Sequence, residues 1–427
     1  MSRHSHASLF LIGFVDTFIS TCDKLRLCLL LPVDGLSIHP LHVPHWCCMV
    51  NQSSLNRIRL FYAAYFAAMG LILPFFPLYL DERGLDAALI GFMTGLIALA
   101  KVMAPPWVGH LLDKRPHSWA HRFIVVASWL AVFTALLIGL FHQLYLLAAA
   151  VLLFGIFWAS VLPLTDGLSV SVSEAEGADY GRLRVWGSIG FVIASLACGL
   201  WMNGPNIAAF PFVLAGLMVV LAIASAGFPE IERSGEHDHG KAPFPRSFYL
   251  LLAIAFMMQV SHGAYYGFFS LYLADAGFSG WQIASYWVIG VLAEIVLMWR
   301  WSRELQQVSP ALIFSVCLGL AAFRWLGTGL TTDIWFLVGL QLLHAASFAA
   351  FHVAAIAWVK RIAPDSRHGS AQGLFSAAGF GLGSTVGIMG CGLLVGQMGY
   401  SIAFYVCAAI ALLGIPFAWM LSKQRML

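Results

Sequence analysis

The chain has 427 residues, of which 60% are hydrophobic and only 10% are charged, and its formal net charge is +3. A soluble domain carries about 25% charged residues, so this composition excludes a soluble globular protein. The alternating strands of about ten residues that are typical of a membrane barrel do not occur in it. We therefore predict an all-α protein that crosses a membrane several times.

The first 48 residues do not fit the pattern of the rest of the chain. The apolar stretch 7–20 is too short to span a bilayer, and no small-x-small site follows it to mark a cleaved signal. A short interfacial helix is one interpretation of this segment. We favour another, in which Met49 is the natural start and residues 1–48 are a misassigned extension.

From Asn56 onward the hydropathy pattern predicts twelve membrane-spanning helices, each near the length of about 20 residues that a bilayer core requires. The predicted spans are 56–80, 88–112, 120–140, 143–171, 183–203, 207–228, 247–274, 281–301, 309–330, 333–359, 370–397 and 400–421. A polar cytoplasmic linker at 229–246 divides them into two six-helix bundles, at 49–228 and 247–427.

The distribution of basic residues predicts the orientation. If Asn56 lies in the cytoplasm, the outer loops contain only Arg83 among the basic residues, whereas the inner segments contain many. Positive charge gathers on the cytoplasmic side of membrane proteins. We therefore expect both termini in the cytoplasm.

The two bundles repeat each other in sequence. The segment 76–84 (FPLYLDERG) closes the first span, and 269–277 (FSLYLADAG) closes the seventh. Parallel repeats of six helices place the substrate site between the halves, near the membrane midplane.

Several motifs resemble one transporter superfamily. The segment 109–114 (GHLLDK) resembles the G-x-x-x-D-[RK] loop motif of the major facilitator superfamily, although 115–117 (RPH) departs from its usual tail. Within that superfamily the chain is similar to the phenylpropionic acid permease family, from about Ile58 to Phe417. The matching segments are 163–166, 179–188, 262–268, 290–294, 323–325 and 343–344.

The resemblance implies a fold of twelve helices in two pseudo-symmetric bundles. It also implies proton-coupled import of a small aromatic carboxylate, such as 3-phenylpropionate, across a bacterial inner membrane. Composition and spacing do not indicate that substrate. A sugar or nucleoside proton symporter of the same superfamily is the alternative, and a non-transporting membrane sensor is a third interpretation.

Four charged residues fall well away from the ends of predicted spans, where a charge is costly and usually functional. They are Lys101, Asp166, Glu294 and Arg324. Lys101 and Glu294 occupy equivalent places in the repeat, so we expect them to pair across an empty central cavity. A fixed tether between the halves, or snorkelling by Lys101, is the alternative. Arg324 suits a carboxylate ligand. Asp166 either contacts substrate or serves as a gate or a packing partner for Arg184 or for the end of the eleventh span.

Two helix faces combine histidine with aromatic residues. His262, Tyr265 and Tyr266 share one face of the seventh span, and His344 and His352 share one face of the tenth. Histidine titrates near neutral pH and can relay a proton, while aromatic walls suit an aromatic ligand. The alternative is ordinary core packing with hydrogen-bonded histidines.

The remaining expectations concern gating and partners. Gly109, Asp113, Lys114 and Arg184 are expected to control inward gating. The cysteines lack metal spacing, and the segment 235–242 lacks the Ser or Thr of a phosphate loop. We therefore expect no catalytic residues, metal or cofactor, and no enzyme activity. The expected partners are a small substrate, protons and membrane lipids, without nucleic acid, and the protein is expected to be a monomer.

Overall fold

The structure is a computed structural model that describes residues 52–113, 118–228, 243–364 and 367–423. Within these ranges every regular element is a helix, and twelve segments are long and apolar enough to cross a membrane. This confirms the predicted fold class. The predicted extension 1–48 and residues 229–242 of the linker lie outside the described residues.

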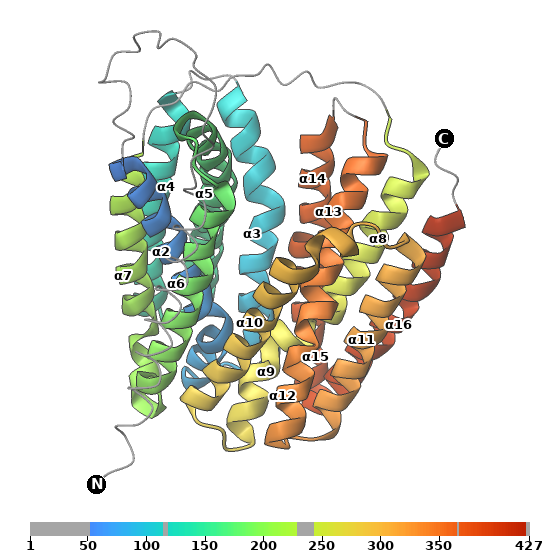
Figure 1. The fold of residues 1–427 in the computed structure, drawn as a ribbon. Coiled ribbons are helices and arrows are strands. Elements are labelled where there is room, and N and C mark those ends of the chain that lie inside the picture. Colours follow the sequence, from blue (N-terminus) through green and yellow to red (C-terminus); the bar gives the residue numbers. More distant parts are fainter. Residues whose placement is uncertain (1–51, 114–117, 229–242, 365–366, 424–427) are drawn as a thin grey trace, which may run out of the picture. The chain divides into compact units, whose positions relative to one another are not determined.

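The first half of the fold consists of helices α2 to α7, which pack against one another (Figure 1). Their bounds are α2 (Gln52–Glu82), α3 (Ala87–Asp113), α4 (Ser118–Leu140), α5 (Leu144–Glu176), α6 (Tyr180–Trp201) and α7 (Phe210–Ala226), with the 3-10 helix η2 (Gly204–Ala209) before α7.

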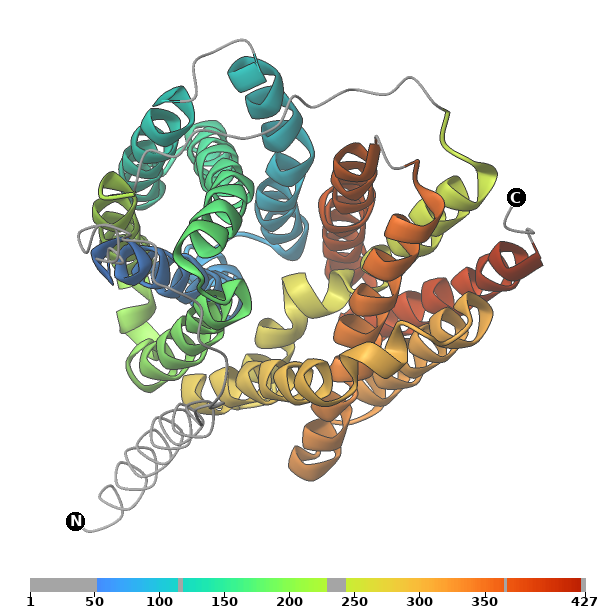
Figure 2. The same ribbon diagram turned by 45° about the horizontal axis from the view of Figure 1, so that its top comes forward.

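The second half contains α8 to α16, drawn in yellow to red in Figures 1 and 2. Three of its spans, predicted as continuous helices, are interrupted. The first consists of α8 (Arg246–Ser261) and α9 (Gly263–Asp275). The second consists of α12 (Ile334–Leu342), η3 (Ala345–Ala350) and α13 (Phe351–Ile362). The third consists of α14 (His368–Ser376), η5 (Ala377–Gly383) and α15 (Ser384–Met398). The uninterrupted helices are α10 (Gly280–Leu305), α11 (Pro310–Leu330) and α16 (Tyr400–Lys423). The short elements η3 and η5 are π-helical, a geometry that occurs often at functional sites.

Polar side chains fix where several helices begin. The Asp179 carboxylate accepts a hydrogen bond from the backbone N–H of Gly181 at 2.7 Å and caps α6. Ser279 and Gln282 form a reciprocal capping box at the start of α10, and Asp333 caps α12. The first N–H groups of a helix lack partners within the helix, and these side chains accept hydrogen bonds from them. The caps therefore define the first residue of each of these helices, which hydropathy does not determine.

The internal repeat extends to the backbone. Gly84 has a φ of 77° and Gly277 has a φ of 86°, and each follows the helix that closes the repeated segment. Glycine adopts this left-handed conformation without steric cost, so both turns use it.

The two halves meet mainly where α3 packs against α15 and η5 and where α6 packs against α10, and α2 also contacts α9. A Cβ atom on Gly91 would lie 2.8 Å from the Cα of Gly392, and one on Gly199 would lie 2.8 Å from the carbonyl oxygen of Gly280. Asn203 accepts a hydrogen bond from the N–H of Gly280 at 2.7 Å. We call these two close approaches the glycine seams. Gly91 lies near the start of α3 and Gly280 opens α10, so both seams lie near the end of the bundle opposite Gln52.

Candidate functional site

A buried polar cluster lies in the second half, centred on Arg324 of α11, whose exposed fraction is 0%. Its Nη1 donates to Nδ1 of His344 at 2.7 Å, and its Nη2 donates to Oε1 of Gln341 at 2.8 Å. The Tyr265 hydroxyl donates to the same Gln341 oxygen at 3.1 Å. Nε2 of His344 lies 2.8 Å from Oε1 of Glu294. We call Arg324, His344 and Glu294 the charge chain.

The charge chain fixes the tautomer of its histidine. Arginine only donates hydrogen bonds, so Nδ1 of His344 must accept from Arg324 and carry no proton. The ring proton therefore lies on Nε2, which donates to the Glu294 carboxylate. A second proton cannot enter the ring at Nδ1 unless the Arg324 bond breaks. Glu294 is thus the member of the chain that can take a proton without breaking that bond.

Aromatic rings surround the guanidinium group. The Cζ atom of Arg324 lies 4.2 Å from the ring centroid of Tyr265 and 4.4 Å from that of Trp325. Trp287 packs on Tyr265 with 4.4 Å between ring centroids. Ring faces attract a cation, most strongly where water is excluded. The buried positive charge is therefore balanced by one carboxylate, reached through His344, and by these rings.

Close helix packing brings the three members of the charge chain together. Gln341 lies near the end of α12, and His344 stands where the backbone passes into the π-helical η3. Gly290 of α10 faces them, since a Cβ atom there would lie 3.2 Å from Cδ2 of His344. A larger residue at this position would crowd the ring. Gly290 therefore lets α10 approach closely enough for Glu294 to reach Nε2.

His262 joins α8 and α9 and interrupts the helix face that the spacing predicted. Its Nδ1 lies 2.8 Å from the carbonyl oxygen of Met258 and donates to it, while Nε2 has no hydrogen-bond partner among the described residues. The ring meets Trp325 edge-on at 4.9 Å and lies 6.1 Å from the ring of His344. His262 is therefore both a hydrogen-bonded core residue and an open acceptor beside the charge chain. Tyr266 stacks on His262 at 5.6 Å.

A column of stacked rings leads away from the charge chain. His344 and Phe348 stack with centroids 5.3 Å apart, and Phe348 and His352 stack with centroids 6.3 Å apart. Phe380 meets the last two rings edge-on. Nδ1 of His352 has no partner among the described residues. The structure thus brings His344 and His352 onto one face, as their spacing predicted, and we call these three stacked rings the histidine column.

A second polar cluster lies in the first half. Oδ1 of Asp166 accepts hydrogen bonds from the hydroxyls of Tyr62 at 2.6 Å and Tyr180 at 3.1 Å. Nε of Arg184 lies 3.8 Å from the same oxygen. Arg184 is part of α6, and its guanidinium lies 4.3 Å from the ring centroid of Phe66 in α2. Asp166 therefore packs near Arg184, which lies in the first turns of α6, inside the predicted span 183–203.

Lys101 and Glu294 do not form the expected pair, because the carboxylate of Glu294 contacts His344. Within the described ranges Lys101 makes no hydrogen bond or ion pair. Lys101 belongs to α3, which packs against α15, whereas Glu294 belongs to α10, which packs against α6. A two-fold repeat places equivalent helices on opposite sides of its axis, and equivalence in the repeat therefore does not imply contact.

The expected gating residues are only partly described. Gly109 and Asp113 belong to the last turns of α3, and Lys114 lies outside the described residues. Of the gating set, Arg184 alone has described side-chain contacts.

The ion pairs of the described residues each lie within one half. They are Arg182–Asp179, Arg184–Asp166, Arg300–Glu304 and His344–Glu294. The same residues contain no group of three or more His, Cys, Asp or Glu side chains placed to hold a metal ion.

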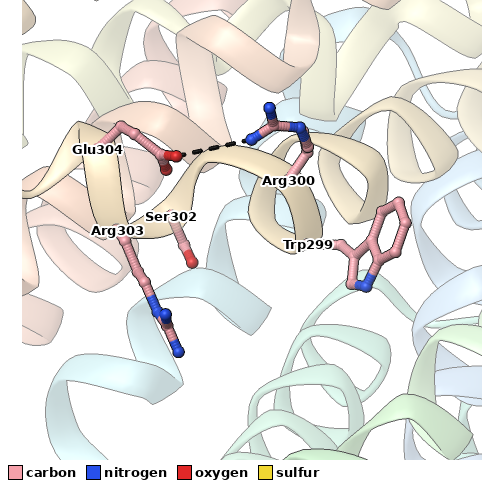
Figure 3. Close-up of a pocket in the computed structure, with 5 residues that line it drawn as sticks. All are labelled: Trp299, Arg300, Ser302, Arg303 and Glu304. Carbon is pink, nitrogen blue, oxygen red and sulfur yellow. Dashed lines mark ion pairs between the residues drawn. The ribbon is translucent and has the colours of Figure 1, made fainter.

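Two surface pockets lie apart from these clusters. Figure 3 shows the first, formed by the last turns of α10 and containing the Arg300–Glu304 ion pair of 3.5 Å; it is lined by Trp299, Arg300, Ser302, Arg303 and Glu304. The second is lined by Arg83, Gly84, Leu85, Leu89, His142, Leu144 and Leu147. Neither pocket is lined by the charge chain, the histidine column or Asp166. We therefore take the buried cluster around Arg324 as the candidate site.

Gln341 is a site residue that the sequence analysis missed. It holds both Arg324 and Tyr265 through one oxygen. The available signal was its position, three residues before His344 in an otherwise apolar stretch, which places both side chains on one helix face.

We expect a double-mutant cycle to separate the observed pair from the expected one. His344→Ala and Glu294→Ala should couple by about 1–3 kcal/mol in the free energy of unfolding, because the two side chains are in contact. Lys101→Met and Glu294→Met should add to within about 0.5 kcal/mol. Denaturant unfolding in mixed micelles measures both cycles. Additive losses for His344 and Glu294 would contradict the charge chain.

Comparison with known proteins identifies related chains. The model of the MFS_1 like family matches residues 55–406. The chain is 29% identical over 387 residues to a probable 3-phenylpropionic acid transporter of Escherichia coli (strain K12), covering 85% of this chain and 97% of that protein. It is 24% identical over 377 residues to a maltose permease of Geobacillus stearothermophilus, covering 86% and 94%. The crystal structure of nucleoside transporter NupG superposes with a TM-score of 0.73 at 16% identity, covering 87% of this chain and 99% of that one.

Proposed function

The chain belongs to the MFS_1 like family of major facilitator transporters, and from this premise we propose that it imports a small aromatic monocarboxylate together with protons. In this proposal it acts as a monomer in the bacterial inner membrane. Both termini lie in the cytoplasm, as the distribution of basic residues favours. The glycine seams then close the periplasmic side, and transport proceeds by rocking of the two halves.

The charge chain is the observation that carries the proposal. A guanidinium group presents several planar donors and matches a carboxylate. Arg324 is fully buried, and its Nε has no hydrogen-bond partner among the described residues. A permanent cation in the membrane core is costly and rarely occurs without a function. The relative in Escherichia coli, named a probable 3-phenylpropionic acid transporter, supports a carboxylate as the ligand.

Glu294 can couple the binding of a proton to the binding of the substrate carboxylate. While ionised, its carboxylate occupies the Nε2 donor of His344 and balances Arg324. A proton on Glu294 removes that negative charge and weakens the bond to His344. A substrate carboxylate then replaces the lost charge beside Arg324 and His344. One proton and one carboxylate leave the net charge of the buried site unchanged, which avoids an unpaired charge in the membrane.

The rings around the charge chain suit an aromatic ligand. Tyr265, Trp287 and Trp325 pack around the guanidinium, and Phe348 continues from His344. A phenyl ring gains by offset or edge-on contact with such neighbours, in addition to the area it buries. The side chains therefore provide an anion anchor bordered by apolar walls, as small-molecule sites generally do.

The test is uptake into proteoliposomes with an imposed pH gradient, acidic outside. We expect labelled 3-phenylpropionate to accumulate in proportion to the gradient. Glu294→Gln should exchange substrate across the membrane but lose gradient-driven accumulation, because an amide cannot take up and release the proton that couples uptake to the gradient. Full accumulation by Glu294→Gln would place the proton carrier elsewhere, with His262, His344 and Asp166 as the next candidates.

Matched controls separate the alternatives. Arg361→Gln removes an exposed arginine whose described hydrogen bond is to the backbone of Gln306, and it should transport like the unaltered protein.

Maltose and uridine are assayed in parallel as alternative substrates. Accumulation of either one, with no accumulation of 3-phenylpropionate, would favour a sugar or nucleoside symporter.

A further inference from the structure

Three buried polar atoms beside the charge chain have no hydrogen-bond partner in the part of the chain that the structure describes. They are Nε2 of His262, Nε of Arg324 and Nε1 of Trp325. His262 and Arg324 are 0% exposed and Trp325 is 1% exposed, so bulk water does not reach them. Buried polar groups are nearly always hydrogen-bonded, and these three atoms therefore indicate a bound ligand or a bound water.

The hydrogen bond on the other side of the His262 ring determines what its free nitrogen can do. Nδ1 lies 2.8 Å from the carbonyl oxygen of Met258. A carbonyl oxygen only accepts hydrogen bonds, so Nδ1 carries the ring proton and Nε2 is an acceptor. The group that completes this site must therefore donate a hydrogen bond.

The two other free atoms are donors, and they lie around the same contact between rings. The indole of Trp325 meets the His262 ring edge-on, with 4.9 Å between centroids. The Cζ atom of Arg324 lies 4.4 Å from the ring centroid of Trp325. A carboxylate only accepts hydrogen bonds, so it can satisfy these donors but not His262. A hydroxyl group donates and accepts, and one hydroxyl can therefore satisfy both Nε2 of His262 and Nε1 of Trp325.

Close backbone packing holds His262 in this place. The residue stands at the break between α8 and α9, and α15 packs against both sides of the break. A Cβ atom on Gly263 would overlap the carbonyl group of Gly387, and one on Gly387 would lie 2.5 Å from the carbonyl oxygen of Val260. These neighbours are backbone atoms, which cannot rotate out of the way as a side chain can. The backbone that carries His262 is therefore fixed, and its free acceptor is part of the built site.

We propose that the substrate carries a hydroxyl group on its aromatic ring and that His262 and Trp325 recognise this hydroxyl. Its O–H donates to Nε2 of His262, its oxygen accepts from Nε1 of Trp325, and the substrate carboxylate accepts from Arg324. The ring centroids of His262 and His344 lie 6.1 Å apart, so the hydroxyl subsite and the carboxylate anchor lie within the length of one small aromatic acid. This inference rests on the proposed function and narrows its substrate class to hydroxylated aromatic monocarboxylates.

Equilibrium dialysis of the purified protein tests this preference. The probes are 3-phenylpropionate and the ortho, meta and para isomers of its ring-hydroxylated form. We expect the unaltered protein to bind one hydroxylated isomer about tenfold to a hundredfold more tightly than 3-phenylpropionate, because only the hydroxyl satisfies the buried acceptor and donor. His262→Phe should bind the two acids within about twofold of each other. Trp325→Phe, which keeps an aromatic ring but loses the N–H, should reduce the preference about threefold to tenfold.

Trp158→Phe is the matched control. Nε1 of Trp158 is also buried and without a partner among the described residues, but it belongs to the first half, where the ring stacks on Tyr65 at 4.9 Å. This change should leave the preference unaltered. His262→Phe spares the carbonyl group of Met258, which still accepts from Ser261 at 2.6 Å. If His262→Phe does not fold, Trp325→Phe against Trp158→Phe decides the question.

The outcomes separate this inference from the proposed function. Absence of binding for every one of these acids overturns the proposed function. Binding of 3-phenylpropionate at least as tight as that of every hydroxylated isomer leaves the proposed function standing and overturns the inference, because the free atoms then bind only water. A preference that persists undiminished in His262→Phe or in Trp325→Phe places the hydroxyl elsewhere and also overturns the inference.

Discussion

We expect Arg324→Gln to abolish gradient-driven uptake and to lower the free energy of unfolding by about 3–5 kcal/mol. The substitution removes the cation that balances Glu294, and it takes away the donors bonded to His344 and Gln341. Buried acceptors that lose their donors are expensive, and a buried charge without its partner is more so. Uptake in proteoliposomes and denaturant unfolding in micelles measure the two effects.

A second variant separates loss of the charge from loss of the fold. Arg324→Gln/Glu294→Gln removes both charges, and its stability should approach that of the unaltered protein, while uptake stays absent. Arg361→Gln, at an exposed position, should change the stability by less than about 1 kcal/mol. Retained uptake in Arg324→Gln would show that Arg324 does not anchor the substrate.

We expect Gly392→Leu to reduce uptake more than about 100-fold by blocking closure at one glycine seam. A Cβ atom on Gly392 would lie 2.8 Å from the carbonyl oxygen of Ala87 and 3.0 Å from the Cα of Gly91. These neighbours are helix backbone, so the larger side chain cannot be accommodated without moving α15 away from α3. A carrier that cannot close one side cannot complete its cycle.

Gly390 provides the matched control, because a Cβ atom there meets nothing within 4 Å. Gly390→Leu on the same helix should keep uptake within about twofold. A cysteine in place of Phe348 reports the conformation: Gly392→Leu should increase its labelling by an impermeant maleimide added outside. Normal uptake by Gly392→Leu would mean that this seam opens little during transport.

Hydropathy predicted the number and the approximate bounds of the spans, because about 20 apolar residues are required wherever the chain crosses a bilayer. It did not predict the interruption at His262 or the π-helical η3 and η5. A break or a wider turn inside an apolar span leaves the apolar content unchanged, so hydropathy carries no signal for it. These features depend on packing between helices, such as the approach of Gly290 to His344.

The sequence also predicted several residues that the structure brings together, because charged and titratable groups in an apolar span stand out by their cost. Glu294, Arg324 and His344 are in direct contact. The sequence did not predict their pairing, because a repeat relates positions and does not specify contacts. The expected pair of Lys101 and Glu294 was wrong for that reason.

Each ion pair of the described residues lies within a single half, and this has a consequence for the speed of the transport cycle. Separating opposite charges in a medium of low dielectric constant would add a large barrier to any movement that pulled the halves apart. The glycine seams join the halves by close backbone contact and by the Asn203–Gly280 hydrogen bond, and neither of these is an ion pair. Among the described residues, no ion pair between the halves then has to break as the carrier reorients, so reorientation carries no such electrostatic barrier.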